Sequence, residues 1–249
     1  MSLRLDEEAL VRIAFDLLRA EGLREDVYLR PLAYKADERI GVGLEGRDEL
    51  TMFAVPFGRC LDHEAGAHAT VSSWQRVDDN AIPARGKIAG AYVNSALAKS
   101  DALAAGFDEA ILLNREGHVS EASAANLFMQ RNGVVVTPPA SDDILECITR
   151  RTIMTLLRDE LGREVVERSI DRTELYVAEE LWICGTGAEI CAITKIDHRT
   201  IGEGKMGPLV GELRALYFDV VRGRVPKYRP WNGAVYATER TPAEGARQG

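Results

Sequence analysis

Residues 80–103, NAIPARGKIAGAYVNSALAKSDAL, join a Pro- and Gly-containing segment to an Ala-rich helical run, with Lys87 at the junction. The residues around Lys87 are small: Ala84, Gly86, Ala89, Gly90 and Ala91. Small side chains let a backbone or a ligand approach closely. Tyr92 follows Lys87 by about one and a half helical turns. The pattern marks Lys87 as a candidate functional amine, although on its own it also fits a solvated lysine ahead of a helix.

The composition excludes several classes of function. The 249 residues carry a net charge of −8, with 46% hydrophobic and 28% charged residues, as in an ordinary globular protein. A negative balance argues against nucleic acid or an anionic membrane as a partner. No apolar run is long enough to span a bilayer, and the acidic, amphipathic start is unlike a secretory signal. We therefore expect a cytoplasmic protein with neither a nucleic-acid nor a membrane partner.

The cysteines and histidines give no sign of a metal site. Four cysteines show neither a CxxC motif nor metal-type spacing: Cys60, Cys147, Cys184 and Cys191. Such cysteines are typical of reduced thiols in the cytoplasm. The four histidines form no HExxH-type pair, so no metal is expected.

Hydrophobic patterns predict a short first part of the chain and a longer second part. The pattern predicts a helix over 6–21 that Gly22 ends, then strands over 27–34 and 50–57. Residues 61–69 have the composition of a linker. We expect residues 1–60 to be a remnant of a small N-terminal domain and 61–69 to be an interdomain loop.

The second part interleaves strands and helices. Strands are predicted at TVSSWQRV, EAILL, EVVERS and ELWIC, and helices after Lys87, over 149–161 and over about 207–222. NLFMQ and VVVTP form a predicted hairpin about Arg131-Asn132-Gly133. This order favours a mixed α/β domain over residues 70–237. The polar residues 238–249 are predicted to be a disordered tail.

Four separate segments share one chemical logic. Lys87 supplies an amine, and Glu121 follows the start of a strand in VSEASAANLF (119–128). Thr149 lies at a helix N-terminus in ILECITRRT (144–152), and Thr186 lies between two glycines in ICGTGAEI (183–190). The last two places offer free amides to an anion such as a phosphate. Taken singly, Glu121 also fits a loop cap, Thr149 a simple N-cap and Thr186 turn chemistry.

Together these groups suggest pyridoxal 5′-phosphate (PLP). A lysine forms the Schiff base with this cofactor. A carboxylate keeps the pyridine nitrogen protonated, so that the ring can take up electrons. A tyrosine can hydrogen-bond the phenolate oxygen of the ring.

The order of the motifs resembles one family. The stretches are YLRPL, VSSWQR, AIPARGKIAGAYVNS, GFDEAILL, VSEASAANLF, ITRRT, RTELYVAEELWICGTGAEI and KYRPW. They resemble the class IV aminotransferases, and most closely the branched-chain amino acid aminotransferases, from about residue 5 to 236. The resemblance implies the fold of the type IV PLP enzymes, with a small N-terminal α/β domain and a larger α/β pseudo-barrel domain. It also implies a homodimer or an assembly of dimers.

The resemblance also implies roles for single residues. Lys87 would bind PLP covalently and then act as the general base of the 1,3-proton shift. Tyr92 would contact the ring oxygen and Glu121 the pyridine nitrogen. The phosphate would be held by Ile148, Thr149 and Thr186. The substrate would be bound by Tyr28, Arg30, Thr186, Gly187 and Ala188; as an edge-strand arginine, Arg30 also fits a solvated charge.

The chain departs from the family pattern in two ways. Phe57 and Cys60 stand where branched-chain enzymes usually have a tryptophan and a tyrosine near the substrate. Met1 aligns with an internal position of the family, so the sequence is expected to lack the family's N-terminal segment. That segment carries an arginine for the PLP phosphate.

We therefore expect a transaminase of branched-chain amino acid metabolism. It would move an amino group between a branched-chain or similar apolar amino acid and 2-oxoglutarate. The alternatives of the same fold are a D-amino acid aminotransferase, an amine transaminase and aminodeoxychorismate lyase. A further alternative is an inactive PLP-fold subunit that serves binding or assembly.

Overall fold

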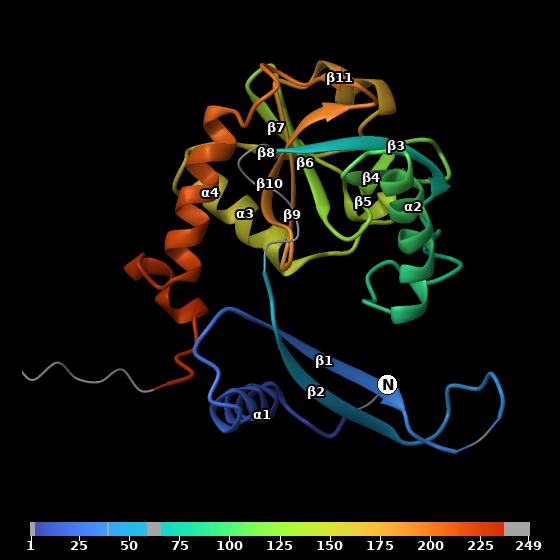
Figure 1. Cartoon of the computed structure of the whole chain (residues 1–249), viewed down its shortest axis with the longest axis vertical. Helices are drawn as coiled ribbons and strands as arrows, with labels where there is room; N and C mark the ends of the chain where they lie inside the picture. Colours follow the sequence, from blue (N-terminus) through green and yellow to red (C-terminus); the bar gives the residue numbers. More distant parts are fainter. Residues whose placement is uncertain (1–2, 39, 59–65, 237–249) are drawn as a thin grey trace, which may run out of the picture. The chain divides into compact units, whose positions relative to one another are not determined.

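The computed structural model describes residues 3–38, 40–58 and 66–236 (Figure 1). The chain divides into two compact units. Unit 1 contains Met1–Gly58 and Pro230–Gly249, and unit 2 contains Arg59–Arg229. The expected tail over 238–249 lies outside the described residues, as does Cys60.

Unit 1 consists of one helix and one antiparallel hairpin. Helix α1 (Glu7–Ala20) begins after Asp6, whose carboxylate accepts a hydrogen bond from the Ala9 amide at 2.7 Å. It ends before Gly22, whose φ of +65° suits a residue without a side chain. Strands β1 (Val27–Lys35) and β2 (Asp48–Pro56) pair along their full length. The predicted helix and both predicted strands are confirmed.

Residues 230–236 group with unit 1, although the sequence placed them with the larger domain. The Tyr236 hydroxyl donates to the carbonyl of Leu18 at 3.0 Å and contacts that of Leu23. The Arg19 Nε donates to the Val235 carbonyl at 2.6 Å. These bonds tie the segment to the end of α1.

Unit 2 is built on one curled, nine-stranded sheet with the order β5-β4-β3-β10-β9-β6-β7-β8, in which β11 pairs with β10. The strands are β3 (Ala67–Gln75), β4 (Glu109–Leu113), β5 (Val119–Ala122), β6 (Asn126–Arg131), β7 (Val134–Thr137), β8 (Val165–Glu167), β9 (Glu180–Gly185), β10 (Glu189–Ile196) and β11 (Arg199–Thr200). The sheet mixes parallel and antiparallel pairs, since β3 is parallel to both of its neighbours.

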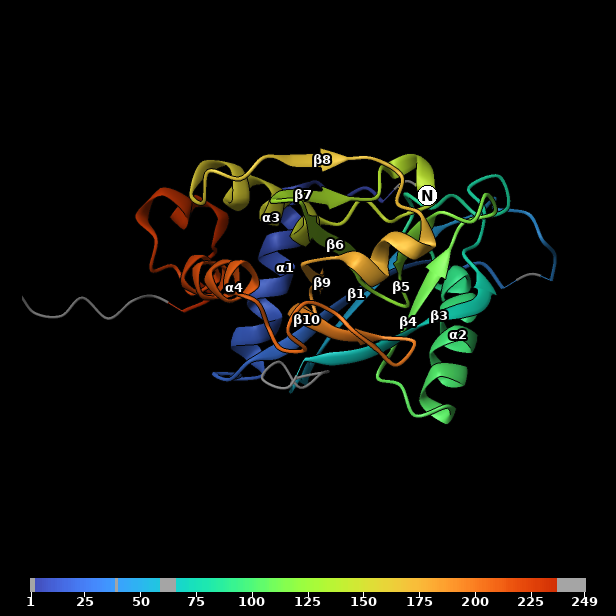
Figure 2. The ribbon, with the colours of Figure 1, turned by 90° about the horizontal axis from the view of Figure 1, so that it is seen from above.

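Three α-helices pack on this sheet. Helix α2 (Tyr92–Ala104) lies on one side of it, and α3 (Ile148–Asp159) and α4 (Pro208–Val221) lie together on the other side (Figures 1 and 2). Short 3₁₀ turns occur at Ala89–Ala91, Ala140–Asp142, Arg172–Val177 and Pro226–Trp231. In the described parts of the chain, none of the helices has the length and apolar character to cross a membrane.

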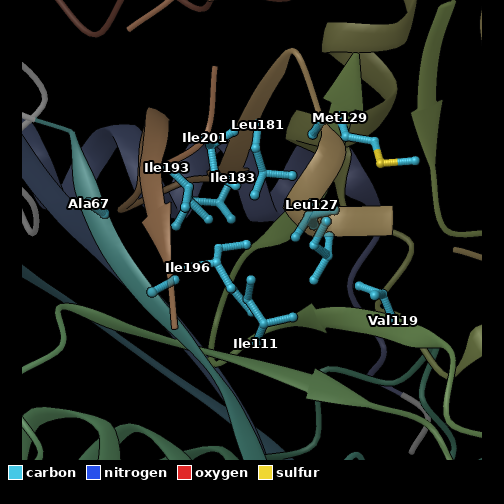
Figure 3. Close-up of a cluster of buried hydrophobic side chains, with 14 of the residues drawn as sticks. Ala67, Ile111, Val119, Leu127, Met129, Leu181, Ile183, Ile193, Ile196 and Ile201 are labelled. Carbon is cyan, nitrogen blue, oxygen red and sulfur yellow. The ribbon is translucent and has the colours of Figure 1, made fainter. Parts of the chain in front are cut away.

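Alternating side chains of the central strands build two cores. Leu181 and Ile183 of β9 join the cluster inside the curled sheet (Figure 3). Between them in the chain, Trp182 faces the opposite way and packs with α3 and α4, together with Cys184. Because both faces of β9 are covered, this strand is apolar on both sides.

Two local features test the sequence-based expectations closely. The hairpin between β6 and β7 is confirmed, and Asn132 and Gly133 adopt the left-handed φ values, 51° and 74°, of a tight turn. The linker over 61–69 is wrong at its end, because β3 begins at Ala67. Ala67 and Ala69 resemble linker residues because they are small, but they are buried beside β4 and β10.

Candidate active site

Lys87 lies in the segment between β3 and α2 and is exposed in unit 2. Its Nζ is 5.7 Å from the centroid of the Tyr92 ring. Tyr92 is the first residue of α2, directly after the 3₁₀ turn. A side chain added at Gly90 would meet no atom within 4 Å, so the small residues leave open space here. The lysine amine and the tyrosine ring are therefore presented together at the start of one helix.

Glu121 is a buried carboxylate on β5, with 5% of the residue exposed. Its Oε1 is 2.9 Å from Arg76 Nη2. Its Oε2 accepts hydrogen bonds from Asn126 Nδ2 at 3.0 Å and from the Leu145 amide at 3.1 Å. Both oxygens are thus held in place by donors from three different segments.

The surroundings of Glu121 shift its proton affinity. Burial raises the pKa of Glu121 from 4.5 to about 7, because desolvation disfavours the charged form. Arg76, the Leu145 amide and the Lys87 ammonium lower this pKa and oppose the effect of burial. The carboxylate therefore changes charge near neutral pH in the cofactor-free chain, and Lys87 lies within its electrostatic reach.

Helix α3 begins with an open N-terminus. Cys147 occupies the N-cap without a side-chain capping bond, and the first turn contains no acidic residue. The first amides of a helix have no partner within it, so those of Ile148 and Thr149 are free for an anion. Thr149 is buried, whereas Ile148 is 73% exposed. Thr149 also shares a side-chain hydrogen bond with Tyr217 of α4.

The turn between β9 and β10 holds the third predicted segment. Gly185 pairs with Glu189 across it, so Thr186, Gly187 and Ala188 form the loop. Thr186 is exposed, and Gly187 and Ala188 are half-buried. Glu189 has a left-handed φ of 53°, which tightens the turn.

Hydrogen bonds connect these segments around Glu121. Leu145, whose amide bonds Glu121, lies three residues before α3. Asn126, whose side chain bonds Glu121, pairs on β6 with Cys184 of β9, just before the loop at Thr186. The structure thus brings together Lys87, Tyr92, Glu121, Ile148, Thr149 and the loop 186–188 within unit 2.

Tyr28 and Arg30 lie in unit 1, on β1. The Arg30 guanidinium lies 5.2 Å from the Tyr28 ring centroid, and the Tyr28 and Phe57 rings are 5.1 Å apart. These three side chains form one cluster, whose part in substrate binding stays a prediction.

Sequence reasoning missed two side chains that support the site. Arg76 is paired with Glu121, and Tyr217 is bonded to Thr149. Arg76 ends the VSSWQR stretch, so its position in that motif is a signal that could have found it. Tyr217 gave no such signal, because it lies on an amphipathic helix among apolar residues.

The other titratable groups suggest neither a metal nor a disulfide. In the described ranges, no group of three or more His, Cys, Asp or Glu residues could hold a metal ion. Cys147, Cys184 and Cys191 are free thiols. Burial raises the pKa of the Cys184 thiol well above its usual value, and that of Cys191 to about 11.

This set of donors fits PLP. Lys87 offers an amine, Tyr92 a phenol and α3 an open helix N-terminus. A carboxylate has about four lone-pair sites, and three donors contact Glu121, so one site is left for the N–H of a ring. An amine, an oriented carboxylate and an anion site together allow covalent catalysis on amino compounds.

Comparison with known proteins identifies the family. The family model "Amino-transferase class IV" matches residues 1–196. A probable branched-chain-amino-acid aminotransferase of Aquifex aeolicus is 48% identical over 237 residues, which cover 95% of this chain and 76% of the relative.

Solved structures give the same answer. The branched-chain aminotransferase of Thermoproteus uzoniensis, solved with norvaline, matches with a TM-score of 0.91 and 40% identity, over 95% of this chain and 78% of its own. A bacterial branched-chain amino acid aminotransferase, designated T.th. and complexed with N-(5′-phosphopyridoxyl)-L-glutamate, matches with a TM-score of 0.88 and 38% identity, also over 95% and 78%. The chain belongs to the class IV aminotransferases, a family of PLP-dependent enzymes.

Proposed function

We propose that this chain is a branched-chain-amino-acid aminotransferase that uses 2-oxoglutarate as the amino acceptor. The observation that carries the proposal is the pairing of an exposed Lys87 with the buried, hydrogen-bonded Glu121 beside the open N-terminus of α3. The substrate class follows the relatives, whose names and bound norvaline point to branched-chain and similar apolar amino acids. The phosphopyridoxyl-L-glutamate complex of a relative supports glutamate and 2-oxoglutarate as the second pair.

Each residue has a defined task toward the cofactor. Lys87 Nζ binds PLP covalently, and Glu121 accepts a hydrogen bond from the pyridine N–H through its free lone pair. The amides of Ile148 and Thr149, together with Thr186, hold the phosphate. The Tyr92 hydroxyl contacts the ring oxygen. These tasks match the position of each group in unit 2.

The reaction divides between cofactor and protein. When bound, PLP supplies an electron-withdrawing ring that makes the α-proton of an amino acid acidic. Lys87 Nζ removes this proton and then returns it, which is general base and general acid catalysis by one amine. The negative charge of Glu121 keeps the ring nitrogen protonated throughout.

Substrate binding has two proposed parts. The amides of the Thr186-Gly187-Ala188 loop bind the α-carboxylate, and Tyr28 and Arg30 contact the substrate side chain. Apolar residues exposed along α2, which include Val93 at 63% and Leu97 at 41%, support a homodimer. The cytoplasm is the proposed compartment, and the three free thiols agree with it.

Replacement of Lys87 tests the proposal. Lys87→Ala protein, loaded with PLP and reduced with borohydride, should yield no lysyl adduct by peptide mass mapping. Its transamination of leucine with 2-oxoglutarate should fall below detection. Lys205→Ala is the matched control, because Lys205 is an exposed lysine paired only with Glu203. An adduct on another lysine in the Lys87→Ala protein would refute the assignment.

A panel of amino donors separates the alternatives. Leucine, isoleucine and valine should react faster with 2-oxoglutarate than D-alanine or an arylalkyl amine. A D-amino acid or amine that reacts faster than leucine would overturn the proposed substrate. A chain that binds PLP on Lys87 but turns over none of these donors would be a binding subunit.

A further inference from the structure

Arg76 occupies a buried position at the end of β3. Its backbone amide donates to the Leu113 carbonyl at 2.8 Å, which fixes it beside β4. Its side chain is 10% exposed. The guanidinium reaches Asp143 O from Nε at 3.1 Å, Ser95 Oγ from Nη1 at 3.5 Å and Glu121 Oε1 from Nη2 at 2.9 Å. All three nitrogens of the planar group therefore have partners on different segments.

Those segments are the ones that carry the site. Ser95 lies on α2, three residues after Tyr92. Asp143 precedes Leu145, whose amide also bonds Glu121, and this stretch leads into α3. A guanidinium presents its donors in a rigid fork, so one side chain fixes all three segments at once.

The buried carboxylate needs a permanent counter-charge. Burying a charge without a partner is costly, and Glu121 is 7% exposed at its side chain. Two cations face it, Arg76 and Lys87. In the proposed function the Lys87 nitrogen is consumed in bonding and proton transfer, so its charge varies during turnover. Arg76 stays protonated at all working pH values.

We propose that Arg76 is a positioning residue that keeps Glu121 ionised and aims its free lone pair at the pyridine nitrogen. Arg76 itself touches neither the substrate nor the cofactor. The part that concerns the cofactor rests on the proposed function, whereas the effect on the charge of Glu121 is present in the cofactor-free chain.

The electrostatics of Glu121 agree with this geometry. Arg76 is the strongest of the groups that lower the pKa of Glu121 against the effect of burial. The other groups are the Leu145 amide and Lys87. The Cys184 thiol also faces Glu121, but burial raises its pKa well above the usual value, so it stays neutral. Without Arg76, burial would therefore dominate.

Carboxyl NMR of the full, cofactor-free chain tests the inference. In protein with ¹³C-labelled glutamate carboxyls, the Glu121 signal is assigned by its loss in Glu121→Gln. Arg76→Met should raise the pKa of Glu121 by about 1 to 3 units, the usual effect of losing an adjacent opposite charge. Arg76→Lys should raise it less, because the charge stays but the fork is lost. Arg168→Met, which breaks the ion pair with Glu174, should leave it unchanged.

The outcomes distinguish positioning from a structural role. A Glu121 pKa in Arg76→Met within about 0.3 units of the original overturns the inference. If Arg76→Met does not fold by circular dichroism, Arg76→Lys decides in the same way, and an unshifted pKa refutes the proposal. In the PLP-loaded enzyme, Arg76→Lys should lower kcat with little change in KM for leucine. The NMR result is independent of the Lys87 adduct, so the proposed function and this inference fail separately.

Discussion

Helices α3 and α4 pack side by side on one face of the sheet, but their N-termini are completed differently (Figure 2). At α4, the Glu180 carboxylate of β9 accepts the Leu209 amide at 3.0 Å and the Val210 amide at 2.9 Å. At α3, Cys147 offers no capping bond and the first turn has no acidic residue. The positive end of α4 is thus neutralised within the fold, while that of α3 is left for a ligand.

The two helix ends use carboxylates in opposite ways. Glu180 is bonded directly to the amides of α4. Near α3, Glu121 takes only the Leu145 amide of the preceding segment and otherwise bonds side chains. The comparison assigns a structural role to Glu180 and a role in the site to Glu121, and four experiments can break or sharpen it.

The largest expected effect is on the pH dependence of stability. The pKa of Glu121 is about 7 in the folded chain and about 4.5 when unfolded, so the folded state binds the proton more tightly. Its contribution to stability is fully present below pH 4.5 and is lost as the pH rises through 7. Between pH 5 and pH 8 this amounts to about 2.5 kcal/mol.

Denaturant unfolding of the cofactor-free chain measures this effect. The free energy of unfolding of the original chain, minus that of Glu121→Gln, should fall by that amount from pH 5 to pH 8. Groups that titrate alike in both proteins cancel in the difference. A difference independent of pH would mean that Glu121 is an ordinary exposed carboxylate.

The second effect is at the closed helix end. Glu180→Ala removes two charge-assisted bonds and should destabilise the chain by about 2 kcal/mol. Its affinity for PLP, measured on the folded protein, should stay within about twofold. Glu203→Ala, at an exposed glutamate paired with Lys205, is the control and should change neither quantity. Loss of PLP affinity in Glu180→Ala with unchanged stability would reverse the assigned roles.

The sequence predicted those parts of the molecule whose cause is local. Gly22 ends a helix and Asn132-Gly133 forms a turn because their own backbone preferences demand it. Lys87, Glu121 and Thr149 could be located because each lies within a distinctive motif. Their proposed roles in binding still await experiment.

The sequence could not predict features that depend on strand order. Arg76 meets Glu121 only because β3, β4 and β5 are neighbours in the sheet. The start of β3 was misread because small residues are typical of linkers, while here they fit the crowded space between β4 and β10. Tyr217 meets Thr149 only because α3 and α4 cover the same face.

The third prediction closes the open helix end. Cys147→Asp supplies the carboxylate that α3 lacks, so the cofactor-free chain should gain about 1 kcal/mol of stability. The same carboxylate competes for the amides and repels a phosphate, so the affinity for PLP should fall at least about tenfold. Cys147→Ser is the matched control, because it caps without charge and should weaken PLP binding much less. An unchanged affinity in Cys147→Asp would place the phosphate elsewhere.

The smallest effect concerns the hydroxyl that joins the two helices. Tyr217→Phe removes the hydrogen bond to Thr149 and leaves the packing of α4 intact. A neutral hydrogen bond of this kind contributes about 0.5 to 1 kcal/mol, so the affinity for PLP should fall about two- to fivefold as Thr149 loses its orientation. Burial raises the pKa of Tyr217, so the phenol stays protonated and the loss should be the same at pH 6.5 and pH 8.5. Tyr34→Phe, which loses a bond to Glu49 in unit 1, is the control for removing a hydroxyl. If PLP titration shows equal affinities for Tyr217→Phe and this control, then Thr149 is oriented by α3 alone, and the open end of α3 needs no support from α4.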